Sequence, residues 1–215
     1  STSIPTSTSH SFIPPSPSDL RSPCPALNAL ANHGHINRDG RDLTVHALVD
    51  AMRRVYNFTK PLAYLLALAG VFLCGDGRTV DLDRLAKHNV IEHDASLSRQ
   101  DTRPPNDYSP ILADLNLVAQ LMHVSPNNFL VLNDLAMARV IRESQAVGGP
   151  LSFPYAEIAK AESGLILQVL GDESLEVDKD VLCTWLVDGR LPDSWEPPKR
   201  RIGIRTTASV RRCIA

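Results

Sequence analysis

A chain of 215 residues, of which 43% are hydrophobic, has enough apolar surface to bury one sizeable core, so we predict a single main domain. Its formal net charge of −2 gives no broad positive field, which excludes nucleic acid as an expected partner. The longest apolar run, 61–74, is too short to cross a bilayer and no charged and apolar leader starts the chain, so we expect a soluble, processed protein with no membrane partner.

The first 22 residues are rich in Pro, Ser and Thr and lack periodicity, which predicts an extended arm over 1–22 outside the core. Such an end suits an extracellular protein. The tripeptide Asn57-Phe58-Thr59 is an acceptor for N-linked glycosylation, which occurs on secreted chains. We therefore expect a secreted, extracellular glycoprotein modified at Asn57.

Helical periodicity begins after this arm. Apolar residues recur every three to four positions in successive segments, which Gly, Pro or polar stretches separate. The predicted helices cover 25–33, 43–56, 61–73, 81–88, 109–122, 126–146, 152–170 and 176–187. No segment alternates as a half-buried strand would. The predicted fold class is all-α, with one domain over 23–198, loop from Asp188 onward and a basic tail over 199–215.

Two of these helices carry a specific expectation. The segment 61–73 is apolar almost all round, which predicts a central, buried helix. In Ser125-Pro126 a capping residue precedes a proline suited to the first helical position, which predicts that the helix 126–146 starts there.

Cys24 stands directly before Pro25, so the cysteine is the predicted N-cap of the first helix. There its sulfur can accept the free N–H groups of Ala26 and Leu27 and lies at the positive end of the helix dipole. Both effects favour the thiolate. A stabilised thiolate is either a nucleophile or a metal ligand.

Three interpretations of this cysteine stay open from the residues alone. It can be a small buried thiol that happens to precede a helix. A nucleophile would need a histidine partner, for which His33 and His35 are candidates. A haem ligand is the third, because a thiolate that donates to iron favours O–O cleavage.

Glu162 lies at the centre of an apolar helix face. The residues three, four and seven positions away on 153–170 are Tyr155, Ile158, Leu165, Ile166 and Val169. A lone carboxylate facing the interior needs a partner, a raised pKa or a solvent-filled cavity. It is either ion-paired with an arginine or a general acid–base group whose apolar pocket tunes its pKa toward working pH.

The loop Glu92-His93-Asp94-Ala95-Ser96 concentrates oxygen donors of the kind that Mg²⁺ or Mn²⁺ accepts. Taken alone, this short segment indicates a solvated loop with a local hydrogen bond between His93 and Asp94 more than it indicates a metal site.

Together, the segment PCPALNALANHG at 23–34, the loop 92–96 and the helix of Glu162 resemble the fungal haem-thiolate peroxidases, the family of chloroperoxidase and the unspecific peroxygenases. The resemblance runs from about Ser22 through 188–195, and the cysteine segment is its most specific part. It implies a chloroperoxidase-like, all-α domain of about seven to nine helices around a buried haem. Long peroxygenases carry Glu-Gly-Asp in the loop and an arginine seven residues before the distal glutamate, whereas this chain has His93 and Tyr155 and so resembles the short group.

By this resemblance, Cys24 is the proximal ligand of haem b, and Glu162 moves a proton across hydrogen peroxide to give a ferryl porphyrin radical. Glu92, the carbonyl of His93 and the hydroxyl of Ser96 bind Mg²⁺ (or Mn²⁺) beside a haem propionate. His93, oriented by Asp94, hydrogen-bonds Glu162.

The resemblance implies an unspecific peroxygenase that inserts oxygen into small aliphatic and aromatic organic substrates, with peroxidase side activity. Halide oxidation of the chloroperoxidase type is the alternative within the family. From other classes, a cysteine hydrolase or a non-catalytic helical binding protein remains possible. The residues expected to line the substrate pocket are Ile91, Ile158, Ala161 and Tyr155.

The other cysteines show no paired spacing. Cys74 and Cys183 lie in apolar helices and are expected to be buried thiols. Cys213 lies in a basic, exposed tail, where an unpaired thiol in an extracellular protein is unstable, so we expect an intersubunit disulfide through Cys213 and a homodimer.

Overall fold

The computed structural model describes residues 10–214, and helices form most of it. The α-helices are α1 Pro25–Asn32, α2 Val45–Tyr56, α3 Lys60–Ala69, α4 Leu115–Met122, α5 Leu132–Ser144, α6 Phe153–Leu170, α7 Lys179–Asp188 and α8 Ile204–Arg211. A π-helical turn, Gly70–Cys74, extends α3, and a 3-10 helix forms Leu82–Ala86. The predicted all-α class is confirmed.

Very short strands add two antiparallel pairs that the sequence did not predict. Leu43–Thr44 (β1) pairs with Thr79–Val80 (β2), and Phe129–Leu130 (β3) pairs with Val177–Asp178 (β4). Two residues are too few to show the alternation by which a strand is recognised, so periodicity could not reveal them. Each pair nevertheless ties together segments that lie far apart in the sequence.

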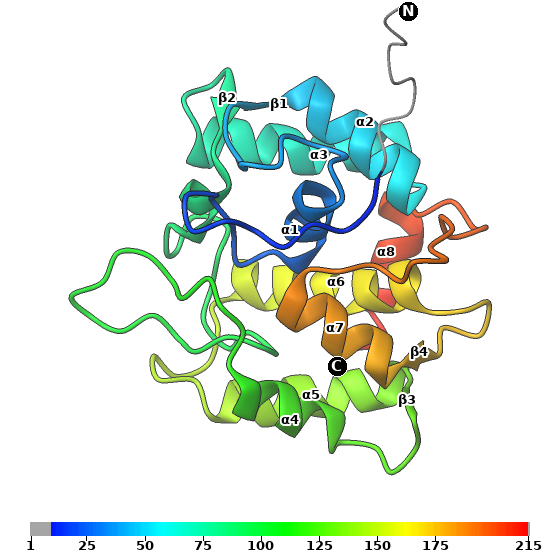
Figure 1. Cartoon of the computed structure of the whole chain (residues 1–215). Helices are drawn as coiled ribbons and strands as arrows, with labels where there is room; N and C mark the ends of the chain where they lie inside the picture. The colour runs from blue at the N-terminus through cyan, green and yellow to red at the C-terminus, as the bar shows by residue number, and fades with distance from the viewer. Residues whose placement is uncertain (1–9, 215) are drawn as a thin grey trace, which may run out of the picture.

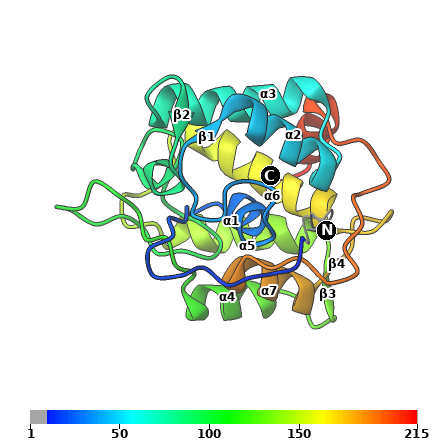
Figure 2. The same ribbon diagram turned by 45° about the horizontal axis from the view of Figure 1, so that its top comes forward.

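Figures 1 and 2 show α1 near the middle of the molecule, with α2 and α3 along one side of it and α4, α5 and α7 along the other. α2 packs on α3, α5 and α8 pack on α6, and α1 packs on α7. Leu30 of α1, Leu167 of α6 and Leu182 of α7 are fully buried in one hydrophobic core. The two helices with predicted chemistry, α1 and α6, therefore both contribute to the core.

The ends of α2 and α7 follow local signals. Thr44 caps α2, because its Oγ1 accepts the N–H of Ala47 at 3.2 Å. Gly189 ends α7 in the left-handed conformation, with φ of 58°. A Cβ at Gly189 would lie 3.0 Å from Asn32 Nδ2 and 3.1 Å from Asn28 Cβ, so glycine allows the end of α7 to approach α1 closely.

The predicted start of the helix 126–146 is wrong. The corresponding helix, α5, begins only at Leu132, because the chain before it forms the strand β3. The carboxylate of Asp134 instead accepts the N–H of Val131 at 2.9 Å and fixes the first turn. Pairing with a distant strand therefore overrides the local capping signal.

The prediction that 61–73 forms a central helix is also wrong. Only one side of α3 is buried, through Leu62, Ala63 and Ala67. Leu65 keeps 54% of its side-chain surface exposed, and Phe72 of the following turn keeps 62%. An apolar composition all round the helix therefore does not place it inside this fold.

The chain after Asp188 is more ordered than predicted. It forms α8, which packs on α6, and Ile202 and Ile214 on either side of α8 are buried. Gly164 of α6 makes room for this contact, since a Cβ there would lie 3.2 Å from Val210 Cγ1. The basic residues of 199–212 therefore lie on a packed helix or directly beside it.

Residues 10–22 of the predicted arm contain no helix or strand and lie against α1. The N–H of Ile13 donates to the carbonyl of Asn32 at 2.9 Å, and His10 Nδ1 donates to the carbonyl of His33 at 3.1 Å. The remainder of the arm, 1–9, lies outside the described residues. Within 10–214 no helix combines the length and apolarity that a membrane span needs.

Candidate active site

Cys24 is the N-cap of α1, as predicted, and Pro25 occupies the first turn. The turn before the helix is held by Asn28, whose side chain donates to the carbonyl of Ser22 at 2.8 Å and accepts the N–H of Ser22 at 2.9 Å. From the neighbouring α2, the hydroxyl of Tyr56 donates to the carbonyl of Ala26 at 2.7 Å. These contacts fix the position of the sulfur on a buried helix.

The sulfur of Cys24 accepts no cap hydrogen bond of regular geometry, although nearby N–H groups influence it. Burial raises the pKa of the Cys24 thiol, while the N–H groups of Leu27 and Ala26 and the charge of Arg99 lower it and the charge of Glu162 raises it. The helix start thus favours the thiolate, as predicted, but the effect of burial is larger, so the pKa of the thiol is raised overall. A cation bound at sulfur would reverse this balance.

Glu162 of α6 lies close enough to Cys24 for its charge to raise the pKa of the thiol, and both groups act on the pKa of the buried Arg99. The Glu162 side chain keeps 59% of its surface exposed, yet protein surrounds it closely enough for desolvation to oppose its ionisation. Both observations fit a carboxylate that protein surrounds but that solvent still reaches. Of the three conditions that the sequence allowed for it, the structure shows a partner.

His93 is the partner of this carboxylate. It is buried, its Nδ1–H donates to the carbonyl of Asp94 at 2.6 Å, and its Nε2 lies 3.4 Å from Glu162 Oε2. That separation is long for a hydrogen bond, so Nε2 has no regular partner among the described residues. Asp94 therefore orients His93 through its main chain, and its carboxylate instead accepts the N–H of Thr102 at 2.9 Å.

The pKa values of the pair move toward an imidazolium and a carboxylate. Burial would lower the pKa of His93, but the contact with Glu162 raises it overall. Desolvation would raise the pKa of Glu162, but His93 and then Arg139 and Arg99 lower it overall. The expectation that an apolar pocket raises the pKa of Glu162 is therefore wrong in this structure. Neither arginine forms an ion pair with it, so the interpretation as an Arg–Glu salt bridge is also wrong.

The loop that carries His93 is held by two arginines of α5, which the sequence reasoning missed. Arg139 donates to the carbonyl of Ala95 at 2.6 Å, and Arg142 donates to the carbonyl of Ser96 at 2.8 Å. Arg142 also forms a buried ion pair with Asp101. Two arginines three residues apart on the inner face of a helix are the sequence signal that could have identified this anchor.

The predicted metal ligands lie on this loop, and the side chains of two of them have partners within the protein. Glu92 Oε2 lies 2.8 Å from His88 Nδ1, and Ser96 Oγ accepts the N–H of Ser98 at 3.4 Å. Burial raises the pKa of Glu92, and His88 opposes the rise. Across residues 10–214 no group of three or more His, Cys, Asp and Glu side chains could hold a metal ion. The expected magnesium site is not a group of this type, because it combines one carboxylate, that of Glu92, with a carbonyl oxygen and a hydroxyl oxygen.

Three of the four predicted pocket residues, Tyr155, Ile158 and Ala161, lie on α6 with the acid. Ile91, Ile158 and Ala161 are half-buried. Tyr155 is held more firmly, because its hydroxyl donates to the carbonyl of Asn89 at 2.5 Å and its ring centroid lies 6.2 Å from that of His93.

These residues fit an iron porphyrin. Cys24 offers a soft sulfur donor, His93 offers a buried nitrogen without a regular hydrogen-bond partner, and Arg99 offers a buried cation. By contrast, His33 and His35 do not partner Cys24 as a hydrolase would require. Both line a separate cavity with His10 and Arg190, and His33 Nε2 accepts the N–H of Leu191 at 3.1 Å.

Comparison with known proteins agrees with this geometry. The family profile described as Peroxidase, family 2, matches residues 10–200. The chain is 30% identical to a chloroperoxidase of Leptoxyphium fumago over 92% of this chain and 60% of that protein. It is 27% identical to an aromatic peroxygenase of Cyclocybe aegerita, over 90% of this chain and 59% of that protein.

A shorter match, 34% identical, covers 49% of this chain and 30% of an aromatic peroxidase of Fusarium equiseti. The chain spans about 60% of the length of the chloroperoxidase that it matches. The match over 10–200 includes Cys24, the loop of His93 and the helix of Glu162, and we conclude that this chain belongs to the fungal haem-thiolate peroxidase family.

Proposed function

We propose that this protein is a peroxide-dependent haem-thiolate enzyme, and that its main activity is oxygen insertion into small organic substrates. The observation that supports the proposal most directly is that Cys24 caps α1 while Glu162, on the distant α6, lies 3.4 Å from the buried His93 and close enough to the sulfur for its charge to act on the thiol. Family membership supports the same chemistry.

Each residue then has a role that its surroundings favour. Haem b, when bound, supplies an iron that accepts the sulfur of Cys24 and activates peroxide. Glu162 Oε2 takes the proton from one peroxide oxygen and returns it to the other, so that water can leave. Protonated His93, fixed by the carbonyl of Asp94, directs Nε2–H at Glu162 and keeps the carboxylate ionised between turnovers.

Two activities within the family compete for this site. The relatives are named a chloroperoxidase and aromatic peroxygenases. The half-buried aliphatic side chains of Ile91, Ile158 and Ala161 favour an apolar organic substrate over a hydrated halide. A product panel of alkane, aromatic, fatty-acid and halide substrates with peroxide distinguishes them, and products limited to halogenated compounds would favour the alternative.

A visible spectrum tests the ligand. The purified holoprotein is expected to show a Soret band that moves far to the red when the reduced protein binds carbon monoxide, and Cys24→Ala should lose that shifted band. Cys183→Ala removes a half-buried thiol elsewhere and is the matched control. A colourless holoprotein, or an unchanged carbon monoxide spectrum in Cys24→Ala, would refute the proposal.

We also propose that Glu92, the carbonyl of His93 and Ser96 hold Mg²⁺ or Mn²⁺. Oxygen donors support this choice of metal, and the side chain of Glu92 would leave His88 to reach it. Elemental analysis should find about one divalent ion per chain and less in Glu92→Ala. Equal metal content in both proteins would contradict the assignment.

Secretion, glycosylation and a disulfide-linked homodimer complete the proposal. Cys213 is exposed, which leaves it accessible to a second subunit. Asn57 is less accessible, because its Nδ2 donates to the carbonyl of Pro198 at 2.8 Å, so a glycan would have to be attached before this contact forms. A single monomeric band on a non-reducing gel would refute the dimer, and an intact mass without added hexoses would refute the glycan.

A further inference from the structure

Arg99 differs from the other buried arginines of the described chain in having no acidic partner. Its side chain is buried, with 5% of the residue exposed. Nε–H donates to the carbonyl of Ile111 at 2.9 Å, and one Nη1–H donates to Ser98 Oγ at 3.0 Å. By comparison, Arg139 pairs with Glu143 at 3.0 Å, and Arg142 pairs with Asp101.

An unpaired guanidinium in this position is expensive, since taking a charge out of water costs several kcal/mol unless an anion compensates it. Arginine has five N–H donors, and the two hydrogen bonds to Ile111 and Ser98 leave three of them for a ligand. The side chain therefore has both the charge and the free donors to bind an oxyanion.

The position of Arg99 limits what that anion can be. The charges of Cys24 and Glu162 both act on the guanidinium, and both favour its protonated form against desolvation. Arg99 also follows the loop 92–96 by only three residues, and that loop carries His93, the partner of Glu162. A carboxylate of a cofactor bound beside this loop could therefore reach the free donors of Arg99.

We propose that Arg99 is a cofactor-binding residue that pairs with a carboxylate of the porphyrin. This inference rests on the proposed function. The side chain is fixed in advance by Ile111 and Ser98, so little rotational freedom is lost on binding, and two parallel N–H donors suit a carboxylate better than a single ammonium group would. Arg99 would anchor the edge of the cofactor while Cys24 holds its centre.

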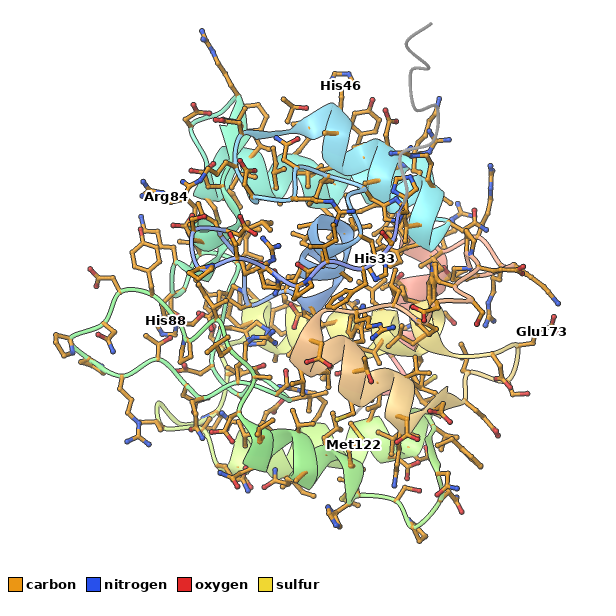
Figure 3. All side chains as sticks on the ribbon, viewed as in Figure 1. His33, His46, Arg84, His88, Met122 and Glu173 are labelled. Carbon is orange, nitrogen blue, oxygen red and sulfur yellow. The ribbon has the colours of Figure 1, made fainter. Side chains whose placement is uncertain are left out.

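The test compares two porphyrins in the full chain. Apoprotein is titrated with haem and with haem dimethyl ester, which lacks both carboxylate charges, and binding is followed by the Soret band. Arg99→Gln is expected to weaken haem binding about tenfold to hundredfold but to change ester binding by less than about threefold. Arg99→Lys should recover part of the affinity for haem. Arg84→Gln, at an exposed site on the periphery (Figure 3), makes the same change of charge and should bind both like the wild type.

Equal weakening of haem and ester by Arg99→Gln would show that Arg99 only supports the fold, and unchanged haem binding would overturn its role directly. The wild-type chain keeps the test valid should the variant fail to fold, since ester binding as tight as haem binding would also overturn the proposal. A wild-type chain that binds neither porphyrin would refute the proposed function itself, and the role of Arg99 with it.

Discussion

Under the proposed function, the pairing of His93 with Glu162 would let one acid both accept and donate a proton. The carbonyl of Asp94 fixes the Nδ1–H of His93, so only Nε2 can exchange a proton with the carboxylate. The 3.4 Å separation between Nε2 and Oε2 and the exposure of the Glu162 side chain would leave the carboxylate free to turn toward a bound ligand. A carboxylate in a fixed ion pair would lack that freedom.

Replacing Glu162 by Gln removes the proton acceptor but keeps the size of the side chain. We expect Glu162→Gln to retain the Soret band and to lower peroxide-driven turnover about 10²- to 10⁴-fold, because the proton must then travel without a positioned base. Steady-state kinetics with a fixed peroxide concentration measure this loss. Glu157→Gln, on another face of α6, should keep near-normal turnover, and near-normal turnover in Glu162→Gln would remove the acid from the mechanism.

At the scale of elements, the long loop between the 3-10 helix and α4 depends on α5. Figure 1 shows this loop extending away from the helices, and it has no helix or strand whose backbone hydrogen bonds could hold it in place. The donors of Arg139 and Arg142 reach the carbonyls of Ala95 and Ser96 and replace the missing backbone bonds. The loop residues of the candidate site are thus positioned from a neighbouring helix.

The ion pair of Arg142 with Asp101 should therefore be important for stability. Arg142→Met leaves a buried carboxylate without its cation and is expected to lower the free energy of unfolding by about 3–5 kcal/mol. Urea denaturation measures the change. The exposed pair of Arg190 with Asp193 is the control, and Arg190→Met should cost less than about 1 kcal/mol. Similar small effects for both variants would show that the buried pair does not anchor the loop.

The sequence predicted those elements whose determinants are local. α6 and the Cys24 cap follow from periodicity and from proline at the helix start, and Glu162 stood out as a charge within an apolar face. The start of α5 and the exposed face of α3 could not be read locally, because a distant strand and the packing of neighbouring helices decide them. The role of Arg142 could not be predicted from local sequence either, because its partner Asp101 lies 41 positions away.

For the molecule as a whole, the arm, α1 and α2 meet at a group of histidines. The rings of His10 and His35 stack with centroids 3.9 Å apart, and His33 lies beside them near the middle of the molecule (Figure 3). Burial lowers the pKa of His35 to about 4, with repulsion from His10, His33, Arg54 and Arg38 adding to the effect. The folded protein therefore resists protonation here more than the unfolded chain does.

Stability should consequently fall with acidification through this group. An unfolded histidine binds its proton near pH 6.5 and folded His35 only near pH 4, so the stabilising contribution is complete above about pH 6.5 and is lost between these values. Urea midpoints measured from pH 7 to pH 4 should decline, and less steeply in His35→Gln. His46→Gln, at an exposed site on α2, should keep the wild-type slope. Identical slopes in all three proteins would contradict this account.

The separation of sulfur and acid along the chain has a consequence for biosynthesis. During translation α1 leaves the ribosome before α6, which begins at Phe153, more than a hundred residues further along the chain. A nascent polypeptide thus contains the thiol of Cys24 well before α6, which carries Glu162, has been made. Under the proposed function, cofactor capture must wait until α6 has been made, and a ribosome-bound intermediate truncated before Phe153 should remain colourless.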